Sequence, residues 1–186
     1  MRNGPTKDLV ITVSGPHGTG KSTYAKALAE ALSLRYLTGG GFFRDLAKER
    51  GVSLEVFSSM AAEDPTIDML VDERTKAEAK KGGVVIDAQL AAWMAKEVAD
   101  LKVLMITSDD VRFRRIAERD DISISEARRQ TLGREQIQKQ RYRKYYGLDI
   151  SDLSIYDLKI DTGLYPIEKT KTIVIDSVRR ALSRAS

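Results

Sequence analysis

Five short runs with the composition of buried strands are spaced along the chain, at residues 8–14, 35–38, 84–87, 102–107 and 157–161. The segments between them repeat apolar residues at the three- and four-residue spacing of an amphipathic helix. Tyr24, Leu28 and Leu32, for example, share one face of a helix predicted over residues 21–32. Strands that alternate with helices in this way predict an α/β three-layer sandwich around a central five-stranded parallel sheet.

Capping and breaking residues predict where the other helices begin. The triple glycine at residues 39–41 is expected to interrupt regular secondary structure before a helix over residues 42–49. Ser53 is the candidate cap of the next helix, although the acid of a complete capping box is missing. A longer helix is predicted from Pro65 to about Lys81. Further helices are predicted at residues 90–98, 108–119 and 167–183, and residues 123–146 are predicted to form a charged helical hairpin.

A length of 186 residues fits one domain, which we predict to span residues 1–186. Two helical insertions, at about residues 39–80 and 120–148, are expected to lie outside the sheet. The 42% share of hydrophobic residues and the 31% share of charged residues are typical of a soluble globular protein. No apolar run is long enough to span a membrane, and residues 1–8 lack the apolar core of a signal peptide. We therefore expect a cytoplasmic protein.

The residue types also exclude some chemistry. The chain has no cysteine, which excludes disulfides, thiolate metal sites and cysteine nucleophiles. The net charge of +4 fits either a nucleic-acid partner or small polyanionic substrates. Because acids are interspersed among the basic residues, we favour a small enzyme that binds nucleotides. The densest basic cluster, residues 112–144, keeps an RNA-binding ATPase open as an alternative.

The strongest chemical signal is a G-x-x-x-x-G-K-S sequence between a predicted strand and a predicted helix. In such a P-loop the backbone N–H groups and the helix N-terminus point at a phosphate group. Lys21 is expected to contact the β- and γ-phosphates of ATP, and Ser22 is expected to ligate Mg²⁺. The predicted ATP-binding residues are Gly15, Pro16, His17, Gly18, Thr19, Gly20, Lys21, Ser22 and Thr23. We interpret His17, the only histidine, as a spacer within this loop.

Asp87 ends the strand at residues 84–87 and is the predicted second Mg²⁺ residue, acting through a bound water. Arginines recur at helical spacing after it: Arg112, Arg115 and Arg119 share one predicted face, and Arg134 and Arg141 share another. Guanidinium groups can neutralise the charge that gathers during phosphoryl transfer between nucleotides. The candidate catalytic residues are therefore Lys21, Arg119, Arg134 and Arg141.

Together these features resemble the nucleoside monophosphate kinase family, and most closely the archaeal type of cytidylate kinase, from about Leu9 to Ala181. Besides the P-loop, the resemblance rests on TGGGFFR at residues 38–44, LAKERG at 46–51, the arginine-rich segment 134–147 and DLSIYD at 152–157.

The resemblance implies a role for each matching position. Thr38 and Arg44 would hold the acceptor monophosphate, and Arg119 would lie against the donor nucleotide. Arg134 and Arg141 would come from a closing lid. Residues 39–80 become the monophosphate-binding insertion and residues 120–148 the lid. Members of the family use ATP with Mg²⁺ to phosphorylate CMP or dCMP.

The chain departs from the family pattern on the acceptor side. Ala88 and Gln89 stand where the family usually has Gly-Arg, and Gln89 is therefore the predicted substrate-binding residue at a phosphate-gripping position. Losing a charge-assisted contact to phosphate costs about 1.5–3 kcal/mol. Gly41 and Gln138 stand where acidic residues are expected.

We predict ATP-dependent phosphorylation of a nucleoside monophosphate, with CMP or dCMP as the expected acceptor. The departures leave open a related kinase with another acceptor, such as AMP or UMP, and a nucleotide-binding protein with little kinase activity. We expect a monomer whose partners are small-molecule nucleotides, without nucleic acid or membrane.

Overall fold

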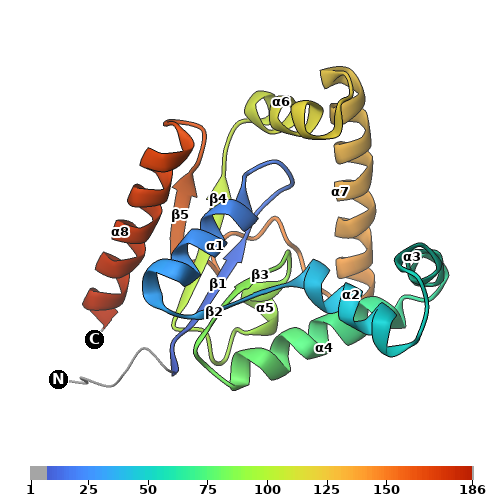
Figure 1. Cartoon of the computed structure of the whole chain (residues 1–186), viewed down its shortest axis with the longest axis horizontal. Coiled ribbons are helices and arrows are strands. Elements are labelled where there is room, and N and C mark those ends of the chain that lie inside the picture. Colours follow the sequence, from blue (N-terminus) through green and yellow to red (C-terminus); the bar gives the residue numbers. More distant parts are fainter. Residues whose placement is uncertain (1–7, 186) are drawn as a thin grey trace.

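The computed structural model describes residues 8–185; residues 1–7, which include most of the polar segment at the start of the chain, lie outside the described part. The strands are β1 (Val10–Ser14), β2 (Arg35–Thr38), β3 (Val84–Asp87), β4 (Leu101–Ile106) and β5 (Leu158–Asp161). They form one sheet in the order β2-β3-β1-β4-β5, and every adjacent pair is parallel (Figure 1). The five-stranded parallel sheet is thus confirmed.

The helices are α1 (Lys21–Leu32), α2 (Gly39–Glu49), α3 (Leu54–Glu63), α4 (Thr66–Lys80), α5 (Ala91–Met94), α6 (Asp109–Asp120), α7 (Ile124–Tyr146) and α8 (Ile167–Ala185). Alternate side chains of each strand enter opposite layers. Ile11 and Val13 of β1 pack with α1 and α8, whereas Val10 packs with α4 and α5. These two apolar clusters hold the sheet between its helices.

The triple glycine does not interrupt the secondary structure, so the predicted helix start at residue 42 is wrong. Gly39 begins helix α2, and the Thr38 side chain accepts a hydrogen bond of 2.8 Å from the backbone N–H of Gly41. This cap satisfies one of the free donors of the first turn, which offsets part of the entropic cost of helical glycine. The predicted Ser53 cap is confirmed, since Ser53 accepts from Val56 N at 3.2 Å.

Residues 124–146 form a single helix of 23 residues rather than the predicted hairpin. Ser123 caps its start by accepting from Glu126 N, and Gly147 ends it with a positive φ of 65°. The interior Gly133 is not sterically required, because a Cβ added there would meet nothing within 4 Å. Helix α5 is also shorter than predicted, with four residues.

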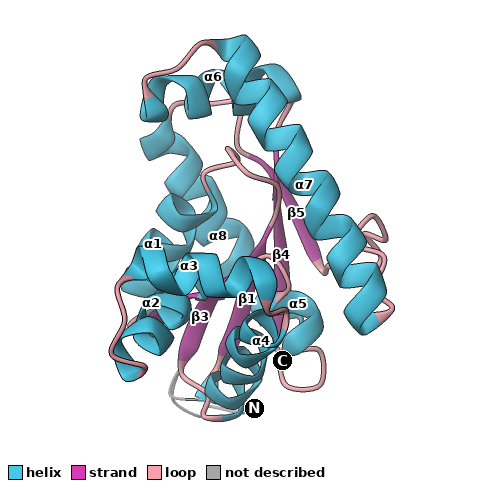
Figure 2. Ribbon diagram, turned by 90° about the vertical axis from the view of Figure 1, so that its right-hand side faces the viewer, coloured by secondary structure: helices cyan, strands magenta, loops and turns pink. Residues whose placement is uncertain are grey.

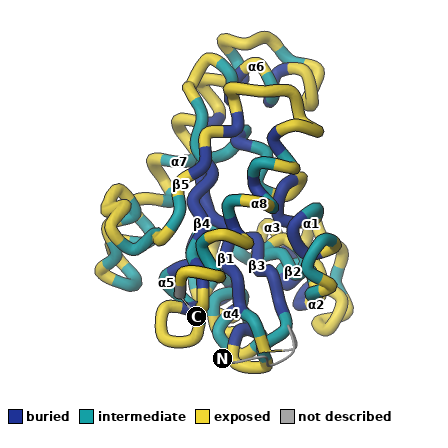
Figure 3. The backbone as a smooth tube through the Cα atoms, turned by 90° about the vertical axis from the view of Figure 1, so that its left-hand side faces the viewer, coloured by how far each residue is buried: buried dark blue, intermediate teal, exposed yellow. Residues whose placement is uncertain are grey.

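The carboxyl ends of the strands gather polar side chains at one edge of the sheet. Asp87 of β3 pairs in register with Val13 of β1 and with Thr38 of β2. Helix α6 lies beyond this edge, and α7 runs back from it alongside the sheet (Figure 2); most residues of both helices are exposed or partly exposed (Figure 3). None of the helices described is long and apolar enough to cross a membrane.

Candidate active site

Gly15–Ser22 forms a tight loop between β1 and α1, and glycine is sterically required in it. Gly15 has a φ of 144°, and a side chain there would overlap the carbonyl oxygen of Met105. Gly18 has a φ of 82°, and an added Cβ would lie 2.7 Å from the carbonyl oxygen of Arg112. Both positions combine a left-handed backbone with a close backbone neighbour, so neither accepts another residue without movement.

Side chains from outside this loop donate hydrogen bonds to its carbonyl groups. Arg112 Nε donates to the His17 carbonyl at 2.7 Å, and Thr162 Oγ1 donates to the Thr19 carbonyl at 2.7 Å. Arg115 contacts the Gly18 carbonyl at 3.5 Å and also holds Thr162. In a trans peptide the N–H of the next residue points away from the carbonyl. The N–H groups that follow these carbonyls are therefore turned to the other side, as a phosphate cradle requires.

Lys21 and Ser22 open helix α1 at the inner side of the loop. Lys21 Nζ donates to the Pro16 carbonyl at 3.1 Å, and burial lowers the pKa of its ammonium group. Ser22 Oγ donates to Asp87 Oδ2 at 2.5 Å, and Tyr36 OH donates to the same oxygen at 3.2 Å. Burial, followed by the charge of Asp87, raises the pKa of Tyr36 to about 12.

One hydroxyl and one carboxylate form the donor set that Mg²⁺ takes in nucleotide sites, where waters and phosphates complete its six oxygen ligands. No group of three or more acidic or histidine side chains able to enclose a metal occurs among residues 8–185. Ser22 and Asp87 therefore fit a metal that arrives with a nucleotide, and they do not fit a metal held by protein alone.

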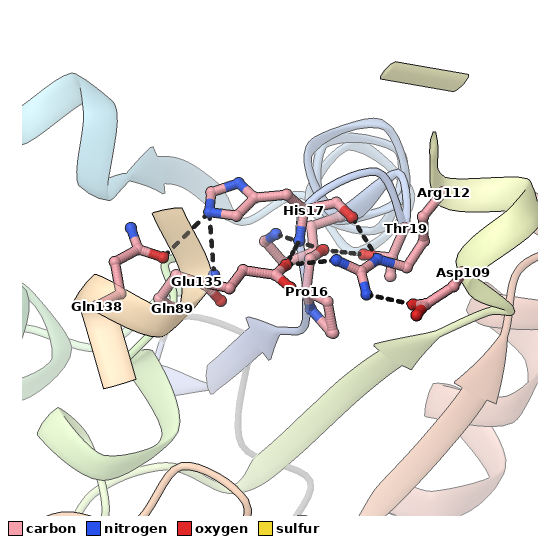
Figure 4. Close-up of polar contacts among 9 residues, drawn as sticks. Pro16, His17, Thr19, Gln89, Asp109, Arg112, Glu135 and Gln138 are labelled. Carbon is pink, nitrogen blue, oxygen red and sulfur yellow. Dashed lines mark hydrogen bonds and ion pairs between the residues drawn. The ribbon is translucent and has the colours of Figure 1, made fainter. Parts of the chain in front are cut away.

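Arg112 ties the loop to helix α7, as Figure 4 shows. Its side chain is only 7% exposed and contacts Asp109 at 2.7 Å as well as Glu135 of α7. Glu135 also accepts from the backbone N–H of His17 at 3.1 Å. Arg112, which the sequence placed on a phosphate-facing stripe, is thus occupied by protein groups.

The departures from the family pattern meet around His17. Its Nε2 lies 3.1 Å from Gln138 Oε1 and 3.5 Å from Gln89 Nε2 (Figure 4). Burial lowers the pKa of His17, and the positive charges of Lys21 and Arg134 lower it further. The imidazole is therefore neutral at pH 7, and the three side chains form an uncharged cluster between the P-loop and α7.

A cavity of about 590 Å³ opens beside this cluster. The predicted residues Lys21, Ser22, Thr38, Arg44, Asp87, Gln89 and Arg141 all line it. Sequence positions from 21 to 141 are thus gathered around one space that is large enough for a nucleotide.

Helix α7 closes one side of the cavity by two contacts with α4. Arg141 forms an ion pair with Asp68, and Tyr146 OH donates to Asp72 Oδ2 at 2.5 Å. Burial raises the pKa of Asp72 to about 6. A candidate catalytic arginine is therefore held by an acid of α4 at this cavity.

Arg119 and Arg134 lie elsewhere. Arg119 lines a separate cavity of about 440 Å³ on the other side of Lys21, together with Ile116 and Ile167, and pairs with Asp120 at 2.7 Å. The exposed Arg134 lines none of the cavities around the P-loop, although its charge lowers the pKa of Lys21.

Trp93 does not line the cavity of about 590 Å³. It lies in an apolar cavity of about 540 Å³ behind the P-loop, where its ring meets Tyr156 edge to face at 5.5 Å between centroids. Leu104, Ile106 and Leu153 complete the apolar wall.

The sequence prediction missed four polar residues of the site: Tyr36, Asp68 and Asp72 line the cavity of about 590 Å³, and Glu135 lines the neighbouring cavity of about 540 Å³. A signal was present for three of them. Tyr36 is two residues before Thr38 and shares its face of β2, while Asp68 and Asp72 are four residues apart on one face of α4. Glu135 has no comparable signal, because its partner Arg112 belongs to another helix.

The chain matches the Cytidylate kinase-like family over residues 10–164. A cytidylate kinase of Staphylothermus marinus is 47% identical over 174 residues, which cover 94% of this chain and 98% of the relative. A cytidylate kinase of Aeropyrum pernix is 47% identical over 168 residues, which cover 90% of this chain and 98% of the relative.

Solved structures share the fold at low sequence identity. A gluconokinase from Sinorhizobium meliloti superimposes with a TM-score of 0.63 at 14% identity, over 97% of each chain. A shikimate kinase from Acinetobacter baumannii, solved with shikimate, gives a TM-score of 0.62 at 15% identity, over 96% of each chain. The predicted P-loop kinase fold is confirmed by these neighbours.

Proposed function

The chain belongs to the cytidylate kinase-like family, and on that premise we propose that it transfers the γ-phosphoryl group of ATP to CMP. It is a nucleoside monophosphate kinase, and a phosphate oxygen of the acceptor attacks the γ-phosphorus while ADP leaves. No protein nucleophile is needed for this reaction.

One observation carries the proposal: the P-loop cradle opens directly into the cavity that Thr38, Arg44 and Arg141 line. A donor phosphate on the loop and an acceptor phosphate in the cavity would therefore be neighbours. Holding two reactants in this way contributes much of the rate enhancement of a kinase.

The donor side follows from the loop and its second cavity. We assign the phosphates of ATP to residues 15–23, and its base to the space between Ile116, Arg119 and Ile167. Lys21 would stabilise charge on the transferred group. Ser22 and Asp87 would hold Mg²⁺, which supplies further neutralisation of phosphate charge when it is bound.

The acceptor side uses Thr38, Arg44 and Gln89. The chain lacks a cation at position 89 and an acid at position 138, so the net charge near His17 is the same as in a chain with Arg and an acid there. Gln89 then contributes a neutral hydrogen bond where a charged one is usual.

We propose that residues 39–80 act as the acceptor-binding insertion and residues 120–148 as the lid of a single kinase domain. Closure would transfer Arg141 from Asp68 to the phosphates and bring Arg134 over the donor. A closed lid excludes water and so suppresses hydrolysis of ATP. The small-molecule partners, a monomeric state and a cytoplasmic location belong to the same proposal.

The test is a panel of CMP, dCMP, UMP and AMP, each supplied with ATP and Mg²⁺, with ADP formation followed by a coupled assay. We expect the highest kcat/KM with CMP or dCMP. Preference for another monophosphate would replace the acceptor. Tight ATP binding without turnover of any monophosphate would refute the kinase proposal, and steeply salt-dependent RNA binding would favour an RNA-binding ATPase instead.

A further inference from the structure

We propose that Asp72 of α4 reads the acceptor base by accepting a hydrogen bond from its exocyclic amine, which selects cytosine over uracil. This inference rests on the proposed kinase function and adds a specificity-determining residue to its acceptor site. Nothing in the motifs of the sequence marks Asp72 for this role.

The cavity is polar at one end and mixed at the other. Lys21 and Ser22 line the end beside the P-loop, where phosphates would lie. At the other end, α4 presents Asp68, Val71 and Asp72, which share one helical face.

An apolar wall suited to one face of a flat ring lies next to these carboxylates. Gly39 begins α2 beside Ala88, and a Cβ added to Gly39 would lie 3.2 Å from the Ala88 Cβ and 4.0 Å from Val71 Cγ1. Gly39, Ala88 and Val71 therefore pack against one another, and Leu90 lines the same cavity. A base lying against this wall would present its polar edge to α4.

Of the two acids, Asp72 is the one available to a base. Asp68 is engaged in the ion pair with Arg141. Asp72 receives only the neutral hydroxyl of Tyr146 on Oδ2, and its Oδ1 has no hydrogen-bond partner among residues 8–185. An ionised carboxylate can only accept hydrogen bonds.

The chemistry of the two pyrimidines then decides the preference. Cytosine carries an amine at position 4 and can donate to Asp72, whereas uracil carries a carbonyl oxygen there and would face a negative oxygen. Loss of a charge-assisted hydrogen bond together with that repulsion predicts a CMP preference of roughly tenfold to a hundredfold or more.

The decisive variant is Asp72→Asn, which keeps the shape and an oxygen for Tyr146 but replaces an acceptor by an amide that can donate to uracil. We expect the ratio of kcat/KM for CMP to that for UMP to fall roughly tenfold to a hundredfold, with UMP gaining in absolute terms. Calorimetric titration of CMP and of UMP into each protein without ATP measures the same ratio without turnover.

The matched control is Asp68→Asn on the same face of α4. It weakens the contact with Arg141 and is expected to change both pyrimidines alike, so that their ratio stays constant. Thermal unfolding checks that each variant is folded.

An unchanged ratio in Asp72→Asn, or a shift in Asp68→Asn instead, overturns the inference, and so does equal binding of CMP and UMP by the unaltered protein. Absence of turnover with every monophosphate would instead refute the proposed function. The titration would then still measure whether Asp72 determines the ratio of CMP binding to UMP binding.

Discussion

Arg112→Met is expected to destabilise the protein strongly, because the guanidinium links three parts of the molecule while nearly buried. It is 7% exposed and joins the His17 carbonyl, Asp109 and Glu135. Methionine fills a similar volume but donates no hydrogen bond. The P-loop carbonyl and the Glu135 carboxylate would then lose their charged partner together.

The magnitude follows from how exposed each partner is. The contact with Asp109, which is 56% exposed, contributes at most about 1 kcal/mol. The hydrogen bond to the His17 carbonyl contributes about 1.5–3 kcal/mol. Glu135, 23% exposed, would keep only one backbone N–H, which costs less than the 3–5 kcal/mol of a fully buried orphan charge. We expect a total of about 3–5 kcal/mol, or a Tm lowered by roughly 6–20 °C in a chain of this size.

Thermal and urea unfolding followed by circular dichroism measure this loss, and a double-mutant cycle with Glu135→Gln measures its source. Because the double variant leaves no unpaired carboxylate at position 135, and Asp109 is solvated, it should be more stable than the sum of the single changes predicts, by about 1–3 kcal/mol. Arg114→Met, an exposed change on the same helix, is the control and should cost less than about 0.5 kcal/mol. Additive single effects, or a loss below about 1 kcal/mol for Arg112→Met, would refute the reasoning.

Three further predictions concern the cavity. Gln89→Arg should lower the KM for CMP roughly tenfold to a hundredfold in steady-state assays, and adding Gln138→Glu should reverse part of that gain; an unchanged KM would mean that another group already holds the phosphate. Lys21→Met should lower kcat roughly 10²–10³-fold while urea unfolding shows no loss of stability, because burial already disfavours the ammonium group and lowers its pKa. Burial raises the pKa of Asp72 to about 6 in the folded protein, above the value of about 4 of an aspartate in an unfolded chain, so the folded state binds more protons between these values. Stability should therefore fall as pH rises from about 4 to 6, by up to about 3 kcal/mol. Asp72→Asn should remove that slope, and a slope of the same size in the variant would assign it to other groups.

Local patterns carried the prediction of the fold a long way. Strand β3 at residues 84–87 and helix α1 at residues 21–32 have the predicted bounds. A short apolar run and an amphipathic repeat predict secondary structure well because both signals lie within the element itself. The prediction was wrong at Gly39, where a side-chain cap from Thr38 outweighed the poor helix propensity of glycine. It was wrong again for residues 124–146, where an exposed helix gave no periodic signal strong enough to exclude a turn.

In the candidate site, too, some features could be predicted from the sequence and others could not. A loop of consecutive residues can be identified from its sequence, and the glycines of residues 15–20 do form a tight loop between β1 and α1, whose binding of phosphate stays a prediction. The roles of the arginines cannot be identified from the sequence in this way, because the role of a guanidinium group depends on the groups that contact it in the folded structure. Arg112 lies against the loop and an acid of α7, Arg119 lines another cavity, and Arg141 crosses to α4.

The sequence by itself determined the alternation of strands and helices, the P-loop and the carboxylate at residue 87, because each depends on residues close together in the chain. Only the tertiary structure decided that His17, Gln89 and Gln138 form one uncharged cluster, and that Asp68 and Asp72 contact helix α7 at the cavity. These contacts join positions about 70 to 120 residues apart, and their partners are chosen by the packing of the sheet and helices rather than by any local pattern.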